Sequence, residues 1–261
     1  MKDTLIRAAR EAGKIIKENF GGRFGIESKE NVTANIVTEI DKKAEAKAIE
    51  IIKNDFPDHG ILAEEIGGID EKADTMWIID PIDGTSNFAH GLPICCVSIG
   101  VEKDGEVVMG AVYNPILDEF FFAEKGEGAF LNDKRISVSN TESFQLSLLV
   151  TGFPYDTSRD PDNPLGVFGE IVLMDVPVRR LGSAAIDLCW VACGRFDGFW
   201  EYNLNPWDVA AGYLIVKEAG GKITDFSNNE LSIYKRQILA TNGKIHDTLL
   251  KAIKKGASKK S

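Results

Sequence analysis

The stretch that decides the fold is Trp77–Phe88, which reads W-I-I-D-P-I-D-G-T-S-N-F. Its first residues are apolar, as in a buried strand, and two carboxylates, Asp80 and Asp83, stand where that strand ends. Gly84 and Thr85 follow, and a glycine before small hydroxyl residues is typical of a turn that opens into a helix. Carboxylates at a strand end suit hard cations, and free N–H groups at a helix start suit phosphate. The stretch therefore predicts both halves of a metal-assisted phosphoryl site.

The charge balance bears on the class of partner. The 261 residues suffice for one large domain or two closely packed halves. The formal net charge is −10 and no basic stripe stands out, which argues against nucleic acid, because that binding needs cations to replace counterions. A phosphate substrate remains compatible with an acidic chain, because bound divalent cations can invert the local charge.

The cysteines and the start of the chain indicate a compartment. No cysteine pair has C-x-x-C spacing and all four lie in apolar runs, so we expect buried, reduced thiols rather than disulfides or a zinc site. The start of the chain lacks the apolar core of a signal peptide, and no apolar run approaches the roughly 20 residues of a membrane span. We therefore predict a cytoplasmic protein without a membrane partner. The cysteines are Cys95, Cys96, Cys189 and Cys193.

The order of elements predicts the fold class. A helical apolar face over residues 5–20, with Asp3 or Thr4 as its cap, precedes a polar strand or hairpin and a second helix from Thr38 or Asp41. Residues 94–131 then follow the pattern of an antiparallel meander, and the rest alternates between helix and strand. This order favours α+β, with stacked sheets and helix layers rather than one parallel sheet. We expect a single domain, 1–261, made of two closely packed halves, roughly 1–145 and 146–261.

Three further carboxylates occupy element ends. Glu64 follows a short apolar strand, so it converges with Asp80 if the two strands are neighbours. Asp41 and Asp208 each fall in the first turn of a helix, where local sequence alone favours a capping role. If these groups meet without cations, like-charge repulsion raises several of their pKa values. Oxygen ligands without a His or Cys cluster select Mg²⁺ over zinc, and Asp80 could bridge two ions roughly 3.5–4 Å apart.

Two later segments are candidates for the site's periphery. Residues 152–166 are rich in turn-forming types and suggest a surface loop, for which a position near the site is one option. Gly182–Ala185 opens a helix that is apolar all round. Its small residues allow either close approach of a ligand or tight helix packing, and the two are compatible.

Four motifs together resemble the inositol monophosphatase family. They are E-E at 64–65, D-P-I-D-G-T at 80–85, G-S-A-A at 182–185 and W-D-V-A-A-G at 207–212. The resemblance covers nearly the whole chain, with the motifs in family order and at family-like spacing. It implies a layered αβαβα sandwich, shared with the wider group of lithium-sensitive, Mg²⁺-dependent phosphatases that includes fructose-1,6-bisphosphatases.

The resemblance also implies ligands for two to three Mg²⁺ ions. Glu64, Asp80 and the carbonyl of Ile82 are similar to the ligands of a first ion. Asp80, Asp83 and Asp208 are similar to those of a second. A third, weaker ion in the family depends on the position of Glu64 and on a mobile loop that corresponds to Lys29–Asn31.

Catalytic and substrate roles follow from the same resemblance. Asp41 and the Thr85 hydroxyl are similar to the pair that orients and deprotonates the attacking water, and Glu64 joins them through the third ion. The N–H groups of Gly84 and Thr85 match those that hold the phosphate. The residues implied to border the substrate are Asp83, Gly84, Thr85, Gly182, Ser183, Ala184, Ala185, Glu201 and Asp208.

The implied activity is Mg²⁺-dependent hydrolysis of myo-inositol 1-phosphate by a lithium-sensitive homodimer. The compact length and the G-S-A-A segment favour this branch. A fructose-1,6-bisphosphatase or dual enzyme, a 3′-phosphoadenosine-phosphate nucleotidase and a histidinol-phosphatase stay open. The pair Arg179-Arg180 could bind the second phosphate of a bisphosphate substrate, although a solvated strand end is the simpler interpretation. A different class is a binding partner of the transcription machinery, as some bacterial proteins that resemble this chain are.

Overall fold

The computed structural model describes the chain except for residues 23–24, 29–35, 71–72, 155–156, 158–159 and 259–261. The loop Lys29–Asn31, implied to serve a third ion, therefore lies outside the described residues. The helices are α1 (Lys2–Asn19), α2 (Glu39–Asp55), α3 (Thr85–Ala89), η1 (Phe144–Leu146), α4 (Pro164–Val172), α5 (Ala184–Ala192), α6 (Pro206–Glu218) and α7 (His246–Ser258).

The strands fall into two larger sheets and one small hairpin, β1–β2. The strands before residue 140 are β1 (Ile26–Ser28), β2 (Ile36–Thr38), β3 (Gly60–Ala63), β4 (Gly67–Ile69), β5 (Thr75–Asp83), β6 (Cys96–Lys103), β7 (Glu106–Asn114), β8 (Glu119–Glu124), β9 (Gly128–Leu131) and β10 (Lys134–Arg135). The later strands are β11 (Leu149–Thr151), β12 (Val178–Arg179), β13 (Gly198–Tyr202), β14 (Lys222–Thr224) and β15 (Gln237–Thr241).

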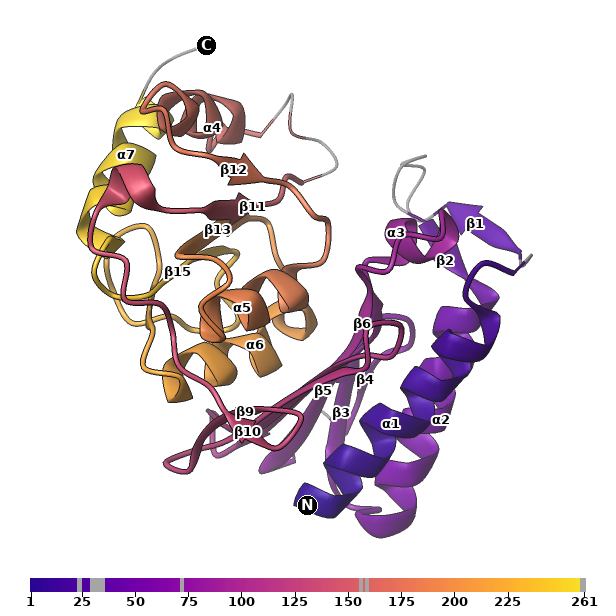
Figure 1. Cartoon of the computed structure of the whole chain (residues 1–261). Helices are drawn as coiled ribbons and strands as arrows, with labels where there is room; N and C mark the ends of the chain where they lie inside the picture. The colour runs from indigo at the N-terminus through magenta and orange to yellow at the C-terminus, as the bar shows by residue number, and fades with distance from the viewer. Residues whose placement is uncertain (23–24, 29–35, 71–72, 155–156, 158–159, 259–261) are drawn as a thin grey trace.

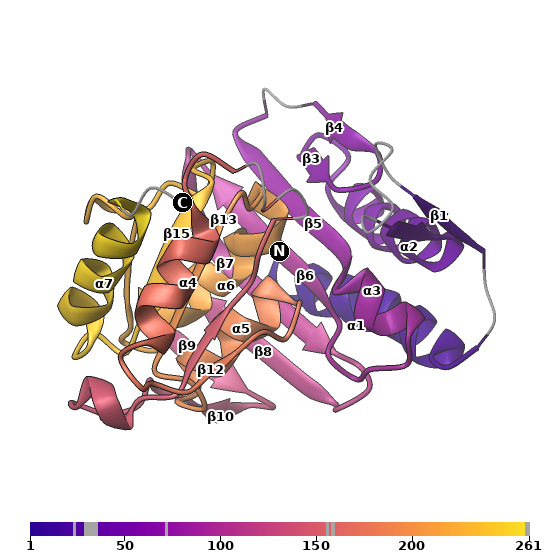
Figure 2. The same ribbon diagram turned by 90° about the horizontal axis from the view of Figure 1, so that it is seen from above.

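The elements stack in the order α, β, α, β, α. Helices α1 and α2 cover one face of the eight-stranded sheet, α5 and α6 lie between that sheet and the five-stranded one, and α4 and α7 cover the far side (Figure 1). Figure 2 shows the same succession from above. Three hydrophobic clusters fill the spaces between these layers. The predicted α+β class and the layered αβαβα sandwich are therefore confirmed.

The eight-stranded sheet sets the position of the acidic strand end. Its order is β10-β9-β8-β7-β6-β5-β3-β4, and β6 to β9 form the predicted antiparallel meander. Strands β3 and β5 run parallel, with Ala63 opposite Ile79. The N–H of Glu64 donates to the carbonyl of Ile79 at 3.2 Å. Glu64 and Asp80 therefore lie side by side where β3 ends, as the sequence predicts for neighbouring strands.

The five-stranded sheet has the order β12-β11-β13-β15-β14. Strand β12 lies at its edge, and Pro177 directly precedes it. The two larger sheets are built from residues before and after the stretch 136–148. The division into halves, 1–145 and 146–261, stays a prediction.

The helices follow their sequence patterns, with one correction. Helix α1 buries one apolar stripe, whereas α5 and α6 are buried on nearly every side because they lie between two sheets. The predicted cap of the first helix, Asp3 or Thr4, is wrong. The helix begins at Lys2 and Met1 precedes it, so both residues lie inside the first turn.

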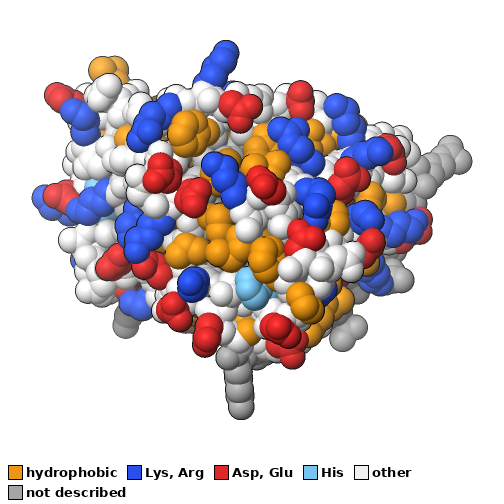
Figure 3. All heavy atoms as spheres, turned by 90° about the horizontal axis from the view of Figure 1, so that it is seen from below, with side chains coloured by type: hydrophobic (Ala, Val, Ile, Leu, Met, Phe, Trp, Pro, Cys, Tyr) orange, Lys and Arg blue, Asp and Glu red, His pale blue; other side chains and the backbone are white. Residues whose placement is uncertain are grey.

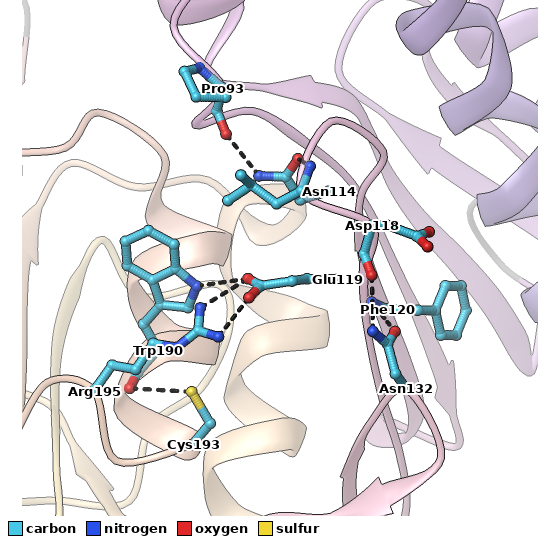
Figure 4. Close-up of polar contacts among 10 residues, drawn as sticks. Pro93, Asn114, Asp118, Glu119, Phe120, Asn132, Trp190, Cys193 and Arg195 are labelled. Carbon is cyan, nitrogen blue, oxygen red and sulfur yellow. Dashed lines mark hydrogen bonds and ion pairs between the residues drawn. The ribbon is translucent and has the colours of Figure 1, made fainter.

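A polar link joins the eight-stranded sheet to the far end of α5 (Figure 4). The carboxylate of Glu119 accepts hydrogen bonds from Trp190 Nε1 at 3.1 Å and from Arg195, whose two terminal nitrogens both donate to it. Paired donation from one guanidinium is geometrically specific. The link fixes the helix whose opposite end carries Gly182–Ala185.

The surface in Figure 3 shows acidic and basic side chains interspersed, with small hydrophobic areas between them and no broad basic patch on that face. Among the described residues, no helix has the length and apolar character needed to cross a bilayer. The described cysteines are all free, and only Cys193 is partly exposed.

Candidate active site

The end of β5 is irregular, and the irregularity places its two carboxylates. Asp80 pairs with Ser98, and Asp83 pairs with Cys96. The chain therefore advances three residues on β5 but only two on β6, which makes a β-bulge in β5. Gly84 then takes φ +94°, and a Cβ there would lie 2.8 Å from the carbonyl oxygen of Ile94. Only glycine fits this turn without strain. The chain therefore reverses directly into α3, at the upper end of the sheet in Figure 1.

Asp83 reaches across to the second half of the chain. Its Oδ2 accepts hydrogen bonds from Ser183 Oγ at 2.8 Å and from the N–H of Ala185 at 2.6 Å. Burial raises the pKa of Asp83 to about 6, although these two bonds lower it. The contact joins the D-P-I-D-G-T and G-S-A-A motifs, which are 100 residues apart.

Asp41 has two sets of partners. Its Oδ2 accepts from the N–H and hydroxyl of Thr38, which completes the capping box of α2. Its Oδ1 accepts from the Thr85 hydroxyl at 2.8 Å, and that hydroxyl also lies 3.0 Å from the carbonyl oxygen of Ile82. Burial raises the pKa of Asp41 despite its bonds to Thr38 and Thr85. The capping role and the pairing with Thr85 therefore coexist in one side chain.

Asp80 is the most buried member of a group of interacting carboxylates. It is 2 % exposed, and its Oδ1 has no hydrogen-bond partner. Burial raises its pKa well above the usual range, and the charges of Glu64, Asp83 and Asp208 raise it further. An unpaired buried carboxylate oxygen is costly unless a proton or a cation compensates it. The group therefore favours binding of positive charge.

Asp208 enters the group from the start of α6. It forms a capping box with Asn205, whose N–H donates to its Oδ2 at 2.6 Å. Burial raises its pKa well above the usual value, and the bonds to Asn205 oppose that shift. Asp208 thus combines a cap with membership of the acidic group, as Asp41 combines its two roles.

The donor set fits a hard cation, but the side chains are not yet arranged around one. Among the described residues, no three His, Cys, Asp or Glu side chains already form a group that could hold a metal ion. The raised pKa of Asp80 and its unpaired Oδ1 nevertheless favour a bound proton or cation at this position. Carboxylate and carbonyl oxygens are the donors that Mg²⁺ prefers. We therefore expect small side-chain movements to accompany ion binding.

Asn87 links two segments next to this group through hydrogen bonds, and no sequence pattern predicts this role. Its Nδ2 donates to the carbonyl oxygens of Ile94 at 2.7 Å and Leu181 at 2.8 Å. It thereby ties α3 to the segment that leads into Gly182, whose φ is +83°. Ser183, Ala184 and Ala185 then start α5 beside Asp83.

Glu201, the last implied contact, lies on β13 and is partly exposed. Burial raises its pKa well above the usual value, with further contributions from the charges of Asp208 and Asp83. It therefore faces the same acidic region. Cys95 and Cys96 follow the motif but are buried, and burial raises the pKa of Cys95 to about 12, which keeps it an unreactive thiol.

Glu45 is a further residue that the sequence analysis missed. It is 1 % exposed on α2, and its carboxylate accepts from the N–H groups of Glu65 at 2.8 Å and Ile66 at 3.1 Å. Burial raises its pKa to about 7, which these bonds partly oppose. It holds the turn that carries Glu64. A charged residue on the buried face of a helix is the signal that could have found it.

We expect Glu45→Gln to raise the Mg²⁺ concentration at which phosphate release is half-maximal. A glutamine accepts only one of the two N–H groups, so the Glu64 turn loses one charge-assisted bond. Such bonds contribute about 1.5–3 kcal/mol, which corresponds to roughly tenfold or more in half-saturating Mg²⁺. A titration of activity against Mg²⁺ measures this, with Glu50→Gln on the exposed face of the same helix as the control. An unchanged titration would mean that the turn keeps its position without Glu45.

Comparison with known proteins agrees with the motifs. The profile of the inositol monophosphatase family matches residues 1–258. An inositol-1-monophosphatase from Synechocystis is 50 % identical over 84 % of the chain and 77 % of its own length. A Nus factor SuhB from Haemophilus influenzae is 42 % identical over 97 % and 96 %. The crystal structure of the suhB protein from Bartonella henselae superposes with a TM-score of 0.92 at 39 % identity, covering 98 % of both chains. The chain therefore belongs to the inositol monophosphatase family.

Proposed function

We propose that the protein is an Mg²⁺-dependent phosphomonoesterase that hydrolyses myo-inositol 1-phosphate to inositol and phosphate. The observation that carries this is the buried, unpaired Oδ1 of Asp80 among the charges of Glu64, Asp83 and Asp208. Membership of the family and the inositol-1-monophosphatase from Synechocystis support the choice of reaction. We further propose a cytoplasmic, lithium-sensitive homodimer.

The proposed ion ligands are the residues of this acidic group. Glu64, Asp80 and the Ile82 carbonyl would hold one ion, and Asp80, Asp83 and Asp208 a second, with Glu64 also serving a third. When bound, Mg²⁺ makes water a better nucleophile at neutral pH and neutralises charge on the phosphoryl oxygens. Oxygen donors without sulfur or imidazole agree with that choice of metal.

The chain's own groups would carry the proton transfer. The Thr85 hydroxyl and Asp41, joined at 2.8 Å, would orient the attacking water, and Asp41 would take its proton. The N–H groups of Gly84 and Thr85 would hold phosphate oxygens. Ser183 and Glu201 would lie along the alcohol part of the substrate. No covalent intermediate is required.

Side-by-side turnover of four phosphate esters tests the proposal. We expect inositol 1-phosphate to give the highest kcat/KM, ahead of fructose 1,6-bisphosphate, histidinol phosphate and 3′-phosphoadenosine 5′-phosphate. Phosphate release should require Mg²⁺ and should fall when lithium is added. A clear preference for one of the other esters would move the assignment to that branch, and turnover indifferent to Mg²⁺ would refute the site.

The names of several relatives favour a second role. The Haemophilus protein, which matches almost the full chain, is named a Nus factor. We propose that this chain could also bind the transcription machinery, independently of catalysis. Retention of RNA polymerase by Asp80→Asn in a pull-down would support that role, and its loss would tie any binding to an intact site.

A further inference from the structure

Glu201 lies against the backbone of Gly152. A Cβ at Gly152 would stand 2.0 Å from Oε1, 2.2 Å from Cδ and 2.3 Å from Oε2 of Glu201. The backbone itself is fixed, because the hydroxyl of Thr151 donates to the carbonyl oxygen of Trp200 at 2.6 Å and β11 pairs with β13 there. Any side chain at position 152 would therefore displace the Glu201 carboxylate rather than the strands.

Asp187, on α5, is a second buried carboxyl in this region. It is 1 % exposed, and neither of its carboxylate oxygens has a hydrogen-bond partner. Burial raises its pKa well above the usual value, with the charge of Glu201 as the next cause, then that of Asp83, while Arg180 acts in the opposite sense. The raised pKa favours the neutral form of Asp187, so its charge is not what positions Glu201.

Glu201 itself has no hydrogen bond to any residue in the described part of the chain that would fix its orientation. Its carboxylate is therefore positioned by the space that Gly152 leaves. Two acceptor oxygens without protein donors suit a ligand that brings donors, which a polyol does through its hydroxyl groups.

We propose that Gly152 is a positioning residue: the space it leaves holds the Glu201 carboxylate toward the hydroxyl groups of the substrate, and so makes the site selective for phosphate monoesters of polyols. This inference rests on the proposed function and deepens it. Gly152 does not touch the substrate; it acts through Glu201. A contact made equally in the ground and transition states changes KM more than kcat.

The test compares a polyol ester with one that has no hydroxyl groups on its alcohol part. Gly152→Ala should raise KM for inositol 1-phosphate about tenfold, because a bond to a charged acceptor is lost, and should leave kcat/KM for p-nitrophenyl phosphate within about twofold. Gly169→Ala, on α4 with nothing within 4 Å of its added Cβ, is the matched control.

A double-mutant cycle separates positioning from general damage. In a Glu201→Ala background, Gly152→Ala should have no further effect on either substrate, because the two changes act on one contact. Equal losses on both esters, or additive losses in the cycle, would overturn the inference. If the wild type hydrolyses p-nitrophenyl phosphate but not inositol 1-phosphate, the proposed function fails. The same ratios are then measured with the best substrate of the four-ester comparison.

Discussion

Asp80→Asn is expected to lower Mg²⁺-stimulated phosphate release by at least about 100-fold. Asp80 is the proposed ligand shared by the first and the second ion, and its buried Oδ1 has no hydrogen-bond partner that could replace a cation. Ion stabilisation of a phosphoryl transition state is worth several kcal/mol, and each 1.36 kcal/mol is about tenfold in rate. Initial rates at saturating substrate over a Mg²⁺ titration measure the loss, with Asp58→Asn on an exposed turn as the control.

The same variant should keep its fold, and the sign of the pKa shifts says why. Asp80, Asp83 and Asp208 all have pKa values raised in the folded protein, chiefly by burial. The folded state therefore prefers their protonated forms. Stability is greatest at low pH and is lost as the pH rises through the raised values, about 6 for Asp83. Without ions, the wild type should melt at a lower temperature at pH 8 than at pH 6, and Mg²⁺ should offset the loss.

Asparagine resembles the neutral carboxyl, so in chelator at pH 8 the variant should melt no lower than the wild type. Thermal melts with and without Mg²⁺ check this. Near-normal turnover by Asp80→Asn would refute the two-ion assignment. A strong fall in its melting temperature in chelator would instead make Asp80 a structural residue.

The local chemistry of the site could be predicted from the sequence because its spacing is short. Thr38 and Asp41 are three residues apart, as are Asn205 and Asp208, and both pairs form capping boxes. The apolar runs of β3 and β5 end in carboxylates, and parallel pairing brings those ends together. Such features need only one element or two neighbouring strands.

The contacts that complete the site come from the stacking of layers, which no local pattern encodes. The bond from Ser183 to Asp83 spans 100 residues, and only the family resemblance indicates that both residues border one site. Glu45 and Asp187 have a weak sequence signal, because each is an acidic residue on a helix face that is otherwise apolar. The contact between Gly152 and Glu201 has no sequence signal, because it depends on the register of β11 against β13.

Asp41→Asn and Thr85→Ala are expected to lower kcat by roughly 10²–10⁴-fold with little change in KM, the range typical of lost general-base catalysis. The 2.8 Å bond from the Thr85 hydroxyl to Asp41 Oδ1 joins a potential base to a hydroxyl that could orient water. Thr85→Ser should recover most of the rate because it keeps the hydroxyl. The base must be ionised, and burial raises the pKa of Asp41. As the pH is lowered, activity should therefore begin to fall at a pH above the usual carboxyl range.

Thr38→Ala separates this role from helix capping, since Asp41 serves both. Removing the Thr38 hydroxyl deletes the N-cap bond to the N–H of Ile40 at 3.1 Å and the hydroxyl bond to Asp41 Oδ2, and should cost about 1 kcal/mol of stability. It leaves the bond between Asp41 and Thr85 in place, so kcat should stay within a few-fold of wild type when it is measured on the folded protein at a pH where Asp41 is ionised. If Thr38→Ala loses as much kcat as Asp41→Asn, Asp41 acts mainly by holding α2. If Thr85→Ala retains normal kcat while Thr38→Ala melts early, the water-orienting pair is refuted and the cap remains.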